Sequence, residues 1–528
     1  MSSPSTSAMP SAVYERRWKT LGVLSLALLI IGLDNTILSV ALPSLQKQLD
    51  ADSSQLQWIN DSYLLVFAGL LLSFGVFGDR FGRKLALQAG TAIFGLASVC
   101  VLFVDTPDQL IAVRAVMGAG GALIMPATLS IISNVFPRDE RGKAIAAWSA
   151  AASVGTGLGP LFGGLLLEWF DWQSVFLLNV PVCVVAFALA IRLVPDSRDP
   201  EPGRFDFAGV TLSAAALLFL VYGIIEAPER GWLDPLTLGF AGAAAAFGLA
   251  FLWWEQRTPE PMLDLSLFRR ARFALGAVAI SLACFSLLGA MFSLTQFLQS
   301  ALGYSALEAG AAMTPIALGI IVGAASGGRL EERFGTAKIV AGGLAVLGAT
   351  LLAAVTWSPS MPYWPIAVWF FVLAVSVGWI LAPATNAVMG AVPEAKAGVG
   401  SAMNDVTRQV ASALGVAVIG SLTTSLYTGT MENETDGLPH GATEAAQDSI
   451  GGAVAVADGM PGDTGASFAD RAADVFTDAM ALGLVGAAVV SLVGALLVLR
   501  FMPARHEPPQ LRVVPAQAPP EPPIALAA

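Results

Sequence analysis

Asp34 is the residue whose type and position raise the first chemical question. It lies within the apolar stretch LLIIGLDNTILSVALP (28–43), away from both ends. A carboxylate in membrane hydrocarbon costs on the order of several kcal/mol, so the sequence must keep it for a reason. It could be paired permanently with an arginine and hold two helices together. We favour the alternative, a proton carrier, because a buried carboxyl can bind and release a proton near neutral pH.

Other ionisable residues also fall within apolar runs. Asp61 lies about one turn into the second run, where it is either a proton or cation site or a solvated residue at a mouth. Asp405 and Arg408 have i,i+3 spacing, which puts them on one face of a helix. They form either a self-neutralising pair, which we favour, or a second site of proton coupling.

The composition requires many membrane-embedded segments. Of the 528 residues, 55% are hydrophobic and 13% are charged, and the mean hydropathy is +0.69. This balance predicts an all-α polytopic membrane protein in contact with membrane lipids. The net charge of −11 and the lack of a basic stripe exclude nucleic acid as a partner.

Cysteine and histidine give no sign of a metal site. Cys100, Cys183 and Cys284 lie in the middle of apolar runs, whereas His440 and His506 lie outside them. We interpret the cysteines as core residues rather than as ligands or disulfide partners. The runs contain no nucleophile with its base and no ligand cluster, so we expect no metal, no cofactor and no enzymatic activity. A channel is also disfavoured, because no filter-like repeat occurs.

Fourteen apolar segments are long enough to cross a bilayer, which takes about 20 residues. They are 20–43, 57–77, 85–104, 109–134, 144–168, 174–194, 206–226, 235–255, 273–301, 306–328, 338–357, 364–390, 397–427 and 474–501. Glu168 and Glu226 end two of them, and we expect both to be interface residues.

The distribution of the 28 Lys and Arg residues sets the orientation. With the N-terminus inside, only Lys47, Arg230 and Arg471 lie on outer segments, and Arg114 and Arg408 lie within spans. All the others lie inside, so the positive-inside rule predicts that both termini are cytoplasmic. Residues 428–473 then form a long external loop, expected to hold a short hairpin or helix.

A short motif is repeated in the chain. GVFGDRFGRK (75–84) follows the second span, and GGRLEERFGTAK (327–338) follows the tenth. Both copies contain an acid, then Arg, Phe and Gly, and both lie on the predicted inner side. Such a repeat indicates a duplicated half, as many transporters have.

The first copy of this motif resembles the loop 2–3 motif of the major facilitator superfamily. Twelve-helix members have six spans between the two copies, whereas this chain has eight, which resembles the fourteen-helix drug:proton antiporter family. Four more stretches fit that family: LDNTILSVALP in helix 1, WINDSYLL in helix 2, RAVMGAGGALIMPATLSII in helix 4 and GTGLGPLFGG in helix 5. Ser39 departs from the helix 1 pattern, which commonly has Asn. The tenth span lacks the acid that some exporters of dications carry, which puts transport of dications in doubt.

The resemblance implies two six-helix bundles with two helices inserted between them. The units are then a cytoplasmic N-terminus (1–19), an N-terminal bundle (20–194), two inserted helices (206–255) and a C-terminal bundle (273–501) that includes the external loop 428–473. A Pro-rich cytoplasmic tail (503–528), expected to be disordered, follows.

The resemblance also assigns roles to residues. Helices 1 and 4 adjoin in this fold, so Arg114 is the expected partner of Asp34. The loop motifs imply a charge latch between the halves, rather than ordinary positive-inside charge; its residues are Asp79, Arg80, Gly82, Arg83, Lys84, Glu332 and Arg333. The antiporter motif of helix 5 implies close packing that seals the pathway; its residues are Gly155, Gly159, Pro160, Gly163 and Gly164.

The substrate pocket is expected near the membrane midplane between the halves. Candidate lining residues are large or polar side chains in the spans, although most such residues are simply core. They are Trp58, Tyr63, Met125, Trp148, Phe292, Gln296, Trp379 and Asn386.

The function expected from the resemblance is proton-driven export of amphipathic drugs or antibiotics across the plasma membrane by alternating access. The alternative is a proton-coupled exporter of one physiological solute, such as a lipid, a peptide or a self-made metabolite. Inhibition by chemically unrelated compounds would favour the drug exporter. We expect the protein to act as a monomer.

Overall fold

The structure, a computed structural model, describes residues 11–198, 206–258, 261, 265–392 and 397–503. The Pro-rich tail lies outside these residues from 504 onward. The described chain contains helices and no strands. Fourteen helical segments are long and apolar enough to cross a membrane, which confirms the predicted number of spans.

The helices cover most of the chain. Those of the first part are α1 (Ser11–Leu49), α2 (Ser53–Phe81), α3 (Arg83–Cys100), α4 (Pro107–Val135), α5 (Arg138–Trp169), α6 (Ser174–Leu177), α7 (Asn179–Leu193), α8 (Phe207–Arg230) and α9 (Pro235–Glu255). Those of the second part are α10 (Ala271–Gln296), α11 (Ala306–Ala312), α12 (Thr314–Phe334), α13 (Thr336–Ala353), α14 (Tyr363–Ala391), α15 (Ala397–Met431), α16 (His440–Asp448), α17 (Ile450–Asp458) and α18 (Gly462–Phe501).

Several helices differ from the apolar segments expected for them. The first two extend beyond 20–43 and 57–77 at both ends, because polar residues continue a helix that hydropathy alone marks only where it is apolar. The sixth span is divided into α6 and α7, and the tenth into α11 and α12. Pro181 and Pro315 lie just after these breaks, where a missing backbone N–H is tolerated in a first helical turn.

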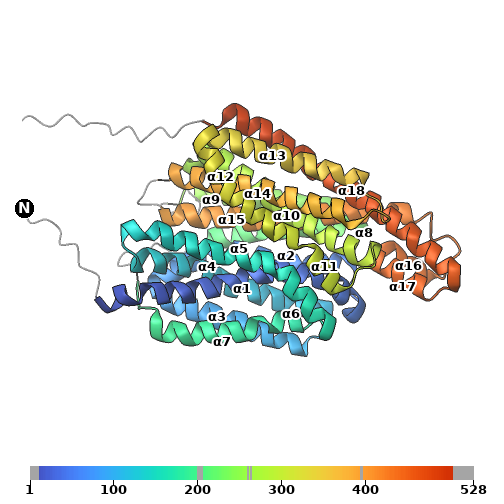
Figure 1. Ribbon diagram of the computed structural model, residues 1–528, viewed down its shortest axis with the longest axis horizontal. Helices are drawn as coiled ribbons and strands as arrows, with labels where there is room; N and C mark the ends of the chain where they lie inside the picture. Colours follow the sequence, from blue (N-terminus) through green and yellow to red (C-terminus); the bar gives the residue numbers. More distant parts are fainter. Residues whose placement is uncertain (1–10, 199–205, 259–260, 262–264, 393–396, 504–528) are drawn as a thin grey trace, which may run out of the picture.

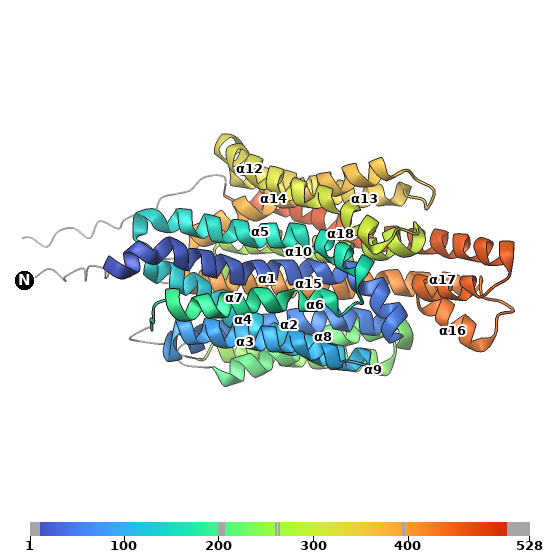
Figure 2. The same cartoon turned by 60° about the horizontal axis from the view of Figure 1, so that its bottom comes forward.

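The helices form two bundles with separate hydrophobic cores. Residues of α1 to α7, here called the N-half, build most of one core cluster, and residues of α10 to α18, the C-half, build most of the other. Some residues belong to the cluster of the other half, so the two cores touch where the halves meet. The inserted pair, α8 and α9, packs against α2 of the N-half and α15 of the C-half. Figures 1 and 2 show the two bundles side by side, with most helices running parallel to one long axis.

The segment between α15 and α18 contains two short helices, α16 and α17, here called the cap helices. They project from one end of the bundle, opposite the first residues of α1 (Figures 1 and 2). We call this the cap end. The external loop was expected to hold a short hairpin or helix, and the structure has two helices there.

The two copies of the repeated motif have the same local shape. Gly82 ends α2 with a φ of 127°, and Gly335 ends α12 with a φ of 86°. Positive φ is strained for residues with a side chain, so the reversal between consecutive helices needs glycine in both copies. Both turns lie at the end of the bundle opposite the cap helices.

The orientation is tested by Gly437→Cys, which places a single cysteine in the segment between α15 and α18. We expect it to react with a membrane-impermeant thiol reagent on intact cells, because the positive-inside rule puts this loop outside. The background must lack the three native cysteines, since Cys100 is itself exposed. As a control, Asp196→Cys at the opposite end should react only after lysis. The reverse pattern of labelling would contradict the orientation.

Candidate functional site

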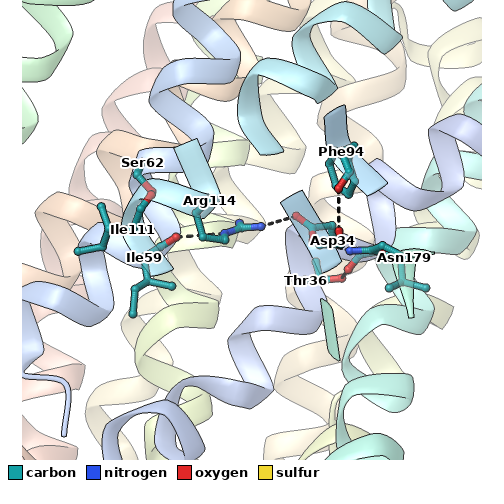
Figure 3. A network of polar contacts seen from close by, with 10 residues as sticks. Asp34, Thr36, Ile59, Ser62, Phe94, Ile111, Arg114 and Asn179 are labelled. Atoms are coloured by element: carbon teal, nitrogen blue, oxygen red, sulfur yellow. Dashed lines mark hydrogen bonds and ion pairs between the residues drawn. The ribbon is translucent and has the colours of Figure 1, made fainter. Parts of the chain in front are cut away.

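Asp34 lies at the centre of a buried polar network in the N-half (Figure 3). Its Oδ2 accepts a hydrogen bond from Nη1 of Arg114 on α4 at 2.5 Å. Its Oδ1 accepts a hydrogen bond from Nδ2 of Asn179 at the start of α7, at 3.1 Å. Asp34 is 0% exposed, and its two partners are each 1% exposed. Both carboxylate oxygens are therefore bound by donors from other helices.

The guanidinium of Arg114 is held by more than its carboxylate partner. Its Nε donates to the carbonyl oxygen of Ile59 at 3.2 Å, and its Cζ lies 4.3 Å from the centroid of the Tyr63 ring. A guanidinium over an aromatic face gains a cation–π attraction. Gly118, one turn after Arg114, allows this approach, because a methyl group there would collide with the backbone of Tyr63.

The network can change its charge without losing all its contacts. While Asp34 is ionised, it is balanced by Arg114, as a buried ion pair requires. If Asp34 takes a proton, the charge attraction is lost, but the carbonyl of Ile59 and the ring of Tyr63 still stabilise the guanidinium. These contacts are compatible with a change of charge at Asp34, whose role as a proton carrier stays a prediction.

Asn179 was missed by the sequence analysis. It lies in the apolar run FLLNVPV, directly after the break between α6 and α7. The signal was an amide next to a helix-breaking proline inside a span, where an unpartnered polar group is costly. Its contact with Asp34 could not be derived, because the rotation of α7 depends on that break.

Asp61 lies on α2 and is 0% exposed. Its Oδ1 accepts from Nδ2 of Asn60 at 3.1 Å, and its Oδ2 has no hydrogen-bond partner. No cation lies within 4 Å of it among the described residues. A buried carboxyl without a cation is tolerated when it carries a proton. The burial argues against the solvated-mouth interpretation, and the proton role stays a prediction.

Asp405 and Arg408 lie on α15, and the structure does not join them by an ion pair within 4 Å. Asp405 is 9% exposed, whereas the side chain of Arg408 is exposed. Asn404, which is also buried, has an unpartnered Oδ1. This face of α15 is therefore polar, but Asp405 and Arg408 do not neutralise each other through a direct contact.

The glycines of the antiporter motif pack against two different neighbours. A methyl group at Gly155, Gly159 or Gly163 would collide with α1, within the N-half. On the opposite side of α5, Gly164 meets the backbone of Ala306, and the carbonyl of Pro160 lies against Gly310 of α11. The motif therefore brings α5 close to α1 on one side and to the C-half on the other.

In the described part of the chain, the latch residues of the first repeat make their contacts with the N-half and with the loop after α7. Nε of Arg83 donates to Oδ1 of Asp79 at 2.8 Å, with i,i+4 spacing. Nζ of Lys84 donates to the carbonyl of Ile191 on α7 at 2.9 Å. Arg80 lies 5.8 Å from the ring centroid of Phe81. Their role as a latch between the halves stays a prediction.

In the second repeat, Arg333 lies 5.3 Å from the ring centroid of Phe334, much as Arg80 lies beside Phe81, but the hydrogen bonds are made by Glu331. Glu331 accepts from Thr336 Oγ1 at 2.8 Å and from Nδ2 of Asn386 on α14 at 3.2 Å. Asn386, proposed as a pocket residue, is exposed and takes part in this contact at the end of the bundle opposite the cap. Glu331 lies directly before Glu332, the acid of the second repeat.

The other pocket candidates are dispersed. Trp58 packs on Tyr222 of α8, with ring centroids 5.6 Å apart, and Nε1 of Trp148 donates to Thr128 at 3.2 Å. Nε1 of Trp379 donates to Ser326 at 2.9 Å. These side chains pack within or beside one half. The remaining candidates are buried or half-buried; they are Tyr63, Met125, Phe292 and Gln296.

The two glutamates expected at interfaces lie at the cap end. Glu226 accepts from Ser54 of α2 at 3.2 Å and from Arg230 at 3.2 Å, so it ties the inserted pair to the N-half. Glu168 lines a hollow at this end. Among the described residues, no group of three or more His, Cys, Asp or Glu side chains could hold a metal ion.

Comparisons with known proteins identify relatives. A family model described as Major Facilitator Superfamily matches residues 24–416. The multidrug efflux pump LfrA of Mycolicibacterium smegmatis is 35% identical over 94% of this chain and 97% of that protein. The tetracenomycin C resistance and export protein of Streptomyces glaucescens is 32% identical over 93% of this chain and 92% of that protein.

Solved structures show the same fold. A bacterial homologue of the human lysosomal transporter Spinster, in an inward-facing conformation, superposes with a TM-score of 0.63. The alignment covers 93% of this chain and 99% of that one, with 19% sequence identity. At this identity the likeness concerns the fold alone.

The buried ion pair of Asp34 and Arg114 predicts that the stability losses of single and double variants are not additive. Arg114→Gln should destabilise the protein by roughly 3–5 kcal/mol, because it leaves Asp34 buried without a cation. Asp34→Asn combined with Arg114→Gln should be less destabilised than Arg114→Gln alone. The measurement is unfolding in detergent at neutral pH. As a control, Arg471→Gln breaks an exposed pair with Glu434 and should cost about 0–1 kcal/mol. Strictly additive losses would contradict the pairing.

If Asp79 belongs to a latch, its replacement should lower the transport rate without preventing folding. Asp79→Asn removes an ion pair that is partly exposed, so stability should change by no more than about 1 kcal/mol. Turnover should nevertheless fall, because the preference between access states changes. The measurement is the transport rate at equal protein level. The control is Glu140→Gln, which breaks the pair with Arg17 outside the motif. Equal rates for both variants would reduce the motif to positive-inside charge.

Proposed function

This chain belongs to the major facilitator superfamily, and we propose that it is a proton-driven antiporter that exports amphipathic drugs or antibiotics by alternating access. Relatives with names of drug efflux and antibiotic resistance cover nearly the whole chain. They favour a drug exporter over the alternative, an exporter of one physiological solute. Membership in a transporter family also supports the expectation that the chain is not an enzyme.

The observation that carries the proposal is the buried pair of Asp34 and Arg114, which lies 0–1% exposed between α1 and α4. An exporter driven by protons needs a carboxyl that gains and loses a proton as the access changes. Asp34 has a cation that balances its ionised form, and that cation has other partners when the carboxyl is neutral. These contacts support proton binding and release at a low energetic cost.

The contacts between the two halves suggest which state this structure represents. At the cap end, Ser421 Oγ donates to Oε1 of Gln57 at 3.1 Å, and Gln299 Nε2 donates to the carbonyl of Val40 at 2.8 Å. Pro160 of α5 also lies against Gly310 there. In the part of the chain that the structure describes, no hydrogen bond or ion pair joins the halves at the opposite end. We infer a state closed at the cap end.

The mechanism follows from charge balance at Asp34. When the site faces the outside, Asp34 takes up a proton and its attraction for Arg114 weakens. When the site faces the inside, an amphipathic cation competes with the proton for the carboxylate or for its surroundings, so drug binding releases the proton. Competition at one carboxyl links the two fluxes reciprocally, since each ligand lowers the affinity for the other.

The membrane, the topology and the partners complete the proposal. The chain crosses a membrane many times, and we propose that this is the plasma membrane, with both termini cytoplasmic and the cap helices outside. Its partners are protons, membrane lipids and a small amphipathic substrate, and we expect it to act as a monomer. Asp61, Asp405 and Arg408 are second candidates for coupling.

Asp34→Asn tests the coupling directly. The amide mimics the neutral carboxyl permanently, so drug-induced proton release and uphill export should both be lost. Binding of a neutral drug should persist. The assay uses proteoliposomes, with ethidium as an amphipathic cation and a dye that reports proton movement. The control, Glu168→Gln, changes an acid at the cap end and should leave the exchange unchanged.

The contrary result is uphill export with intact proton exchange in Asp34→Asn. Asp34 would then not be the carrier, and Asp61→Asn and Asp405→Asn would be the next variants to measure. Loss of export without loss of drug-induced proton release would separate the two fluxes and contradict competition at Asp34.

A further inference from the structure

An acidic residue of the cap helices contacts the start of an N-half helix. Asp448, the last residue of α16, accepts at Oδ1 from the backbone N–H of Ser53 at 3.3 Å. Its carbonyl accepts from Oγ of Ser53 at 2.8 Å. Next to it, Nε2 of Gln46 donates to Oγ of Ser449. Ser53 begins α2, so a segment of the C-half is docked directly on the start of an N-half helix.

Asp448 lies between two hollows. On one side is a large depression of about 1370 Å³ at the cap end, lined by residues of both halves and of the cap. On the other side is a cavity of about 10 Å³ beneath the cap helices, which is about the volume that one water molecule requires. Asp448 lines both, and so do Thr424 and Ser449.

The small cavity is built for a polar occupant. Ser293 on α10 and Thr423 on α15 line it, with exposed fractions of 1% and 4%. The hydroxyls of both have no hydrogen-bond partner in the protein. Buried hydroxyls are nearly always satisfied, if not by protein then by ordered water. A water in this cavity would supply a partner for these hydroxyls, and Asp448 lines the same cavity.

The side of this cavity formed by Gly420 lies against α2, the helix that carries Gln57 and Asp61. Gly420 lines the cavity, and a Cβ placed on it would lie 3.0 Å from Cδ of Gln57. Gln57 in turn accepts from the buried hydroxyl of Ser421. Asp61 is four residues further along α2, on the same face and roughly 6 Å deeper along the axis. Its Oδ2 is buried and unpartnered.

We propose that protons enter from the outside through Asp448 and this water-sized cavity on their way toward Asp61. The path is separate from the path of the drug. It rests on the proposed function. Asp448 gives its proton to a water in the cavity, each water or hydroxyl that accepts a proton gives one of its own to the next water inward, and Asp61 accepts the last, so charge is conserved at each step. Gln57 accepts a hydrogen bond from Ser421 beside this path and is not itself a carrier. The contacts between the halves at the cap end then close the drug path while leaving a route one water wide.

The surroundings of Asp448 fix how this route depends on pH. Burial raises the pKa of the Asp448 carboxyl to about 6, with a smaller contribution from Asp52 of α2, while the N–H of Ser53 opposes the rise. Glu229 of α8 and Tyr427 of α15 also face it. Glu444, Asp458 and Lys47 lie around the same depression. Because a carboxyl binds its proton below its pKa, the route should fill as the external pH falls through about 6.

The test is the initial rate of drug-coupled proton entry against external pH, in right-side-out vesicles with an internal pH dye and ethidium as the drug. In the wild type, the rate should rise as the external pH falls through about 6. Asp448→Asn should lose this rise and slow proton entry by about tenfold or more, as loss of a positioned proton-transfer group does. Ethidium binding should be unchanged.

Two further variants separate the route from a folding defect and from surface charge. Thr423→Val keeps the shape of the side chain but removes a hydroxyl from the cavity, so it should slow proton entry while keeping the midpoint near 6. Glu444→Gln changes an exposed acid on the depression and should behave like the wild type. The proposal is overturned if Asp448→Asn and Thr423→Val both keep the wild-type rate and pH dependence, or if Glu444→Gln slows entry as much as Asp448→Asn. No drug-coupled proton movement in the wild type would instead overturn the proposed function, and the route with it.

Discussion

A charged pair without access to water is the constraint on which the rest of this structure depends. Asp34 and Arg114 lie 2.5 Å apart with almost no exposed surface. Burying two charges is expensive, and replacing such a pair by apolar residues is often neutral or stabilising. A membrane protein that needed only to hold α1 and α4 together would not require it. The pair makes physical sense when the charge of one member changes during the work of the protein.

The neighbouring helices supply further contacts to Asp34 and Arg114. Three groups hold the pair in place while its charge varies: the amide of Asn179 and the carbonyl of Ile59 at hydrogen-bond distance, and the ring of Tyr63 over the guanidinium. Close packing at Gly118 brings α2 to this network, and the motif of α5 brings that helix against α1 on one side and against the C-half on the other. We therefore expect a proton gained or lost at Asp34 to act at the junction of these helices.

The sequence predicted the parts of this arrangement that follow from local rules. Hydropathy gave the number of spans, because about 20 apolar residues are needed wherever a helix crosses hydrocarbon. The contact between Asp34 and Arg114 came from the resemblance to a known fold. The role of Asn179 was not predictable, since its position depends on a break between α6 and α7. Neither was the docking of Asp448 on Ser53, which are 395 residues apart. Such contacts depend on tertiary packing and leave no periodic pattern.

The central claim is that Asp34 changes its protonation when drug binds. The most direct measurement is infrared difference spectroscopy of the purified protein with and without ethidium, using isotope-labelled aspartate to identify the carboxyl stretch. The account predicts that drug binding removes a protonated-carboxyl band, that a carboxylate band appears, and that both changes are absent in Asp34→Asn. The same difference spectrum in the wild type and in Asp34→Asn would contradict it.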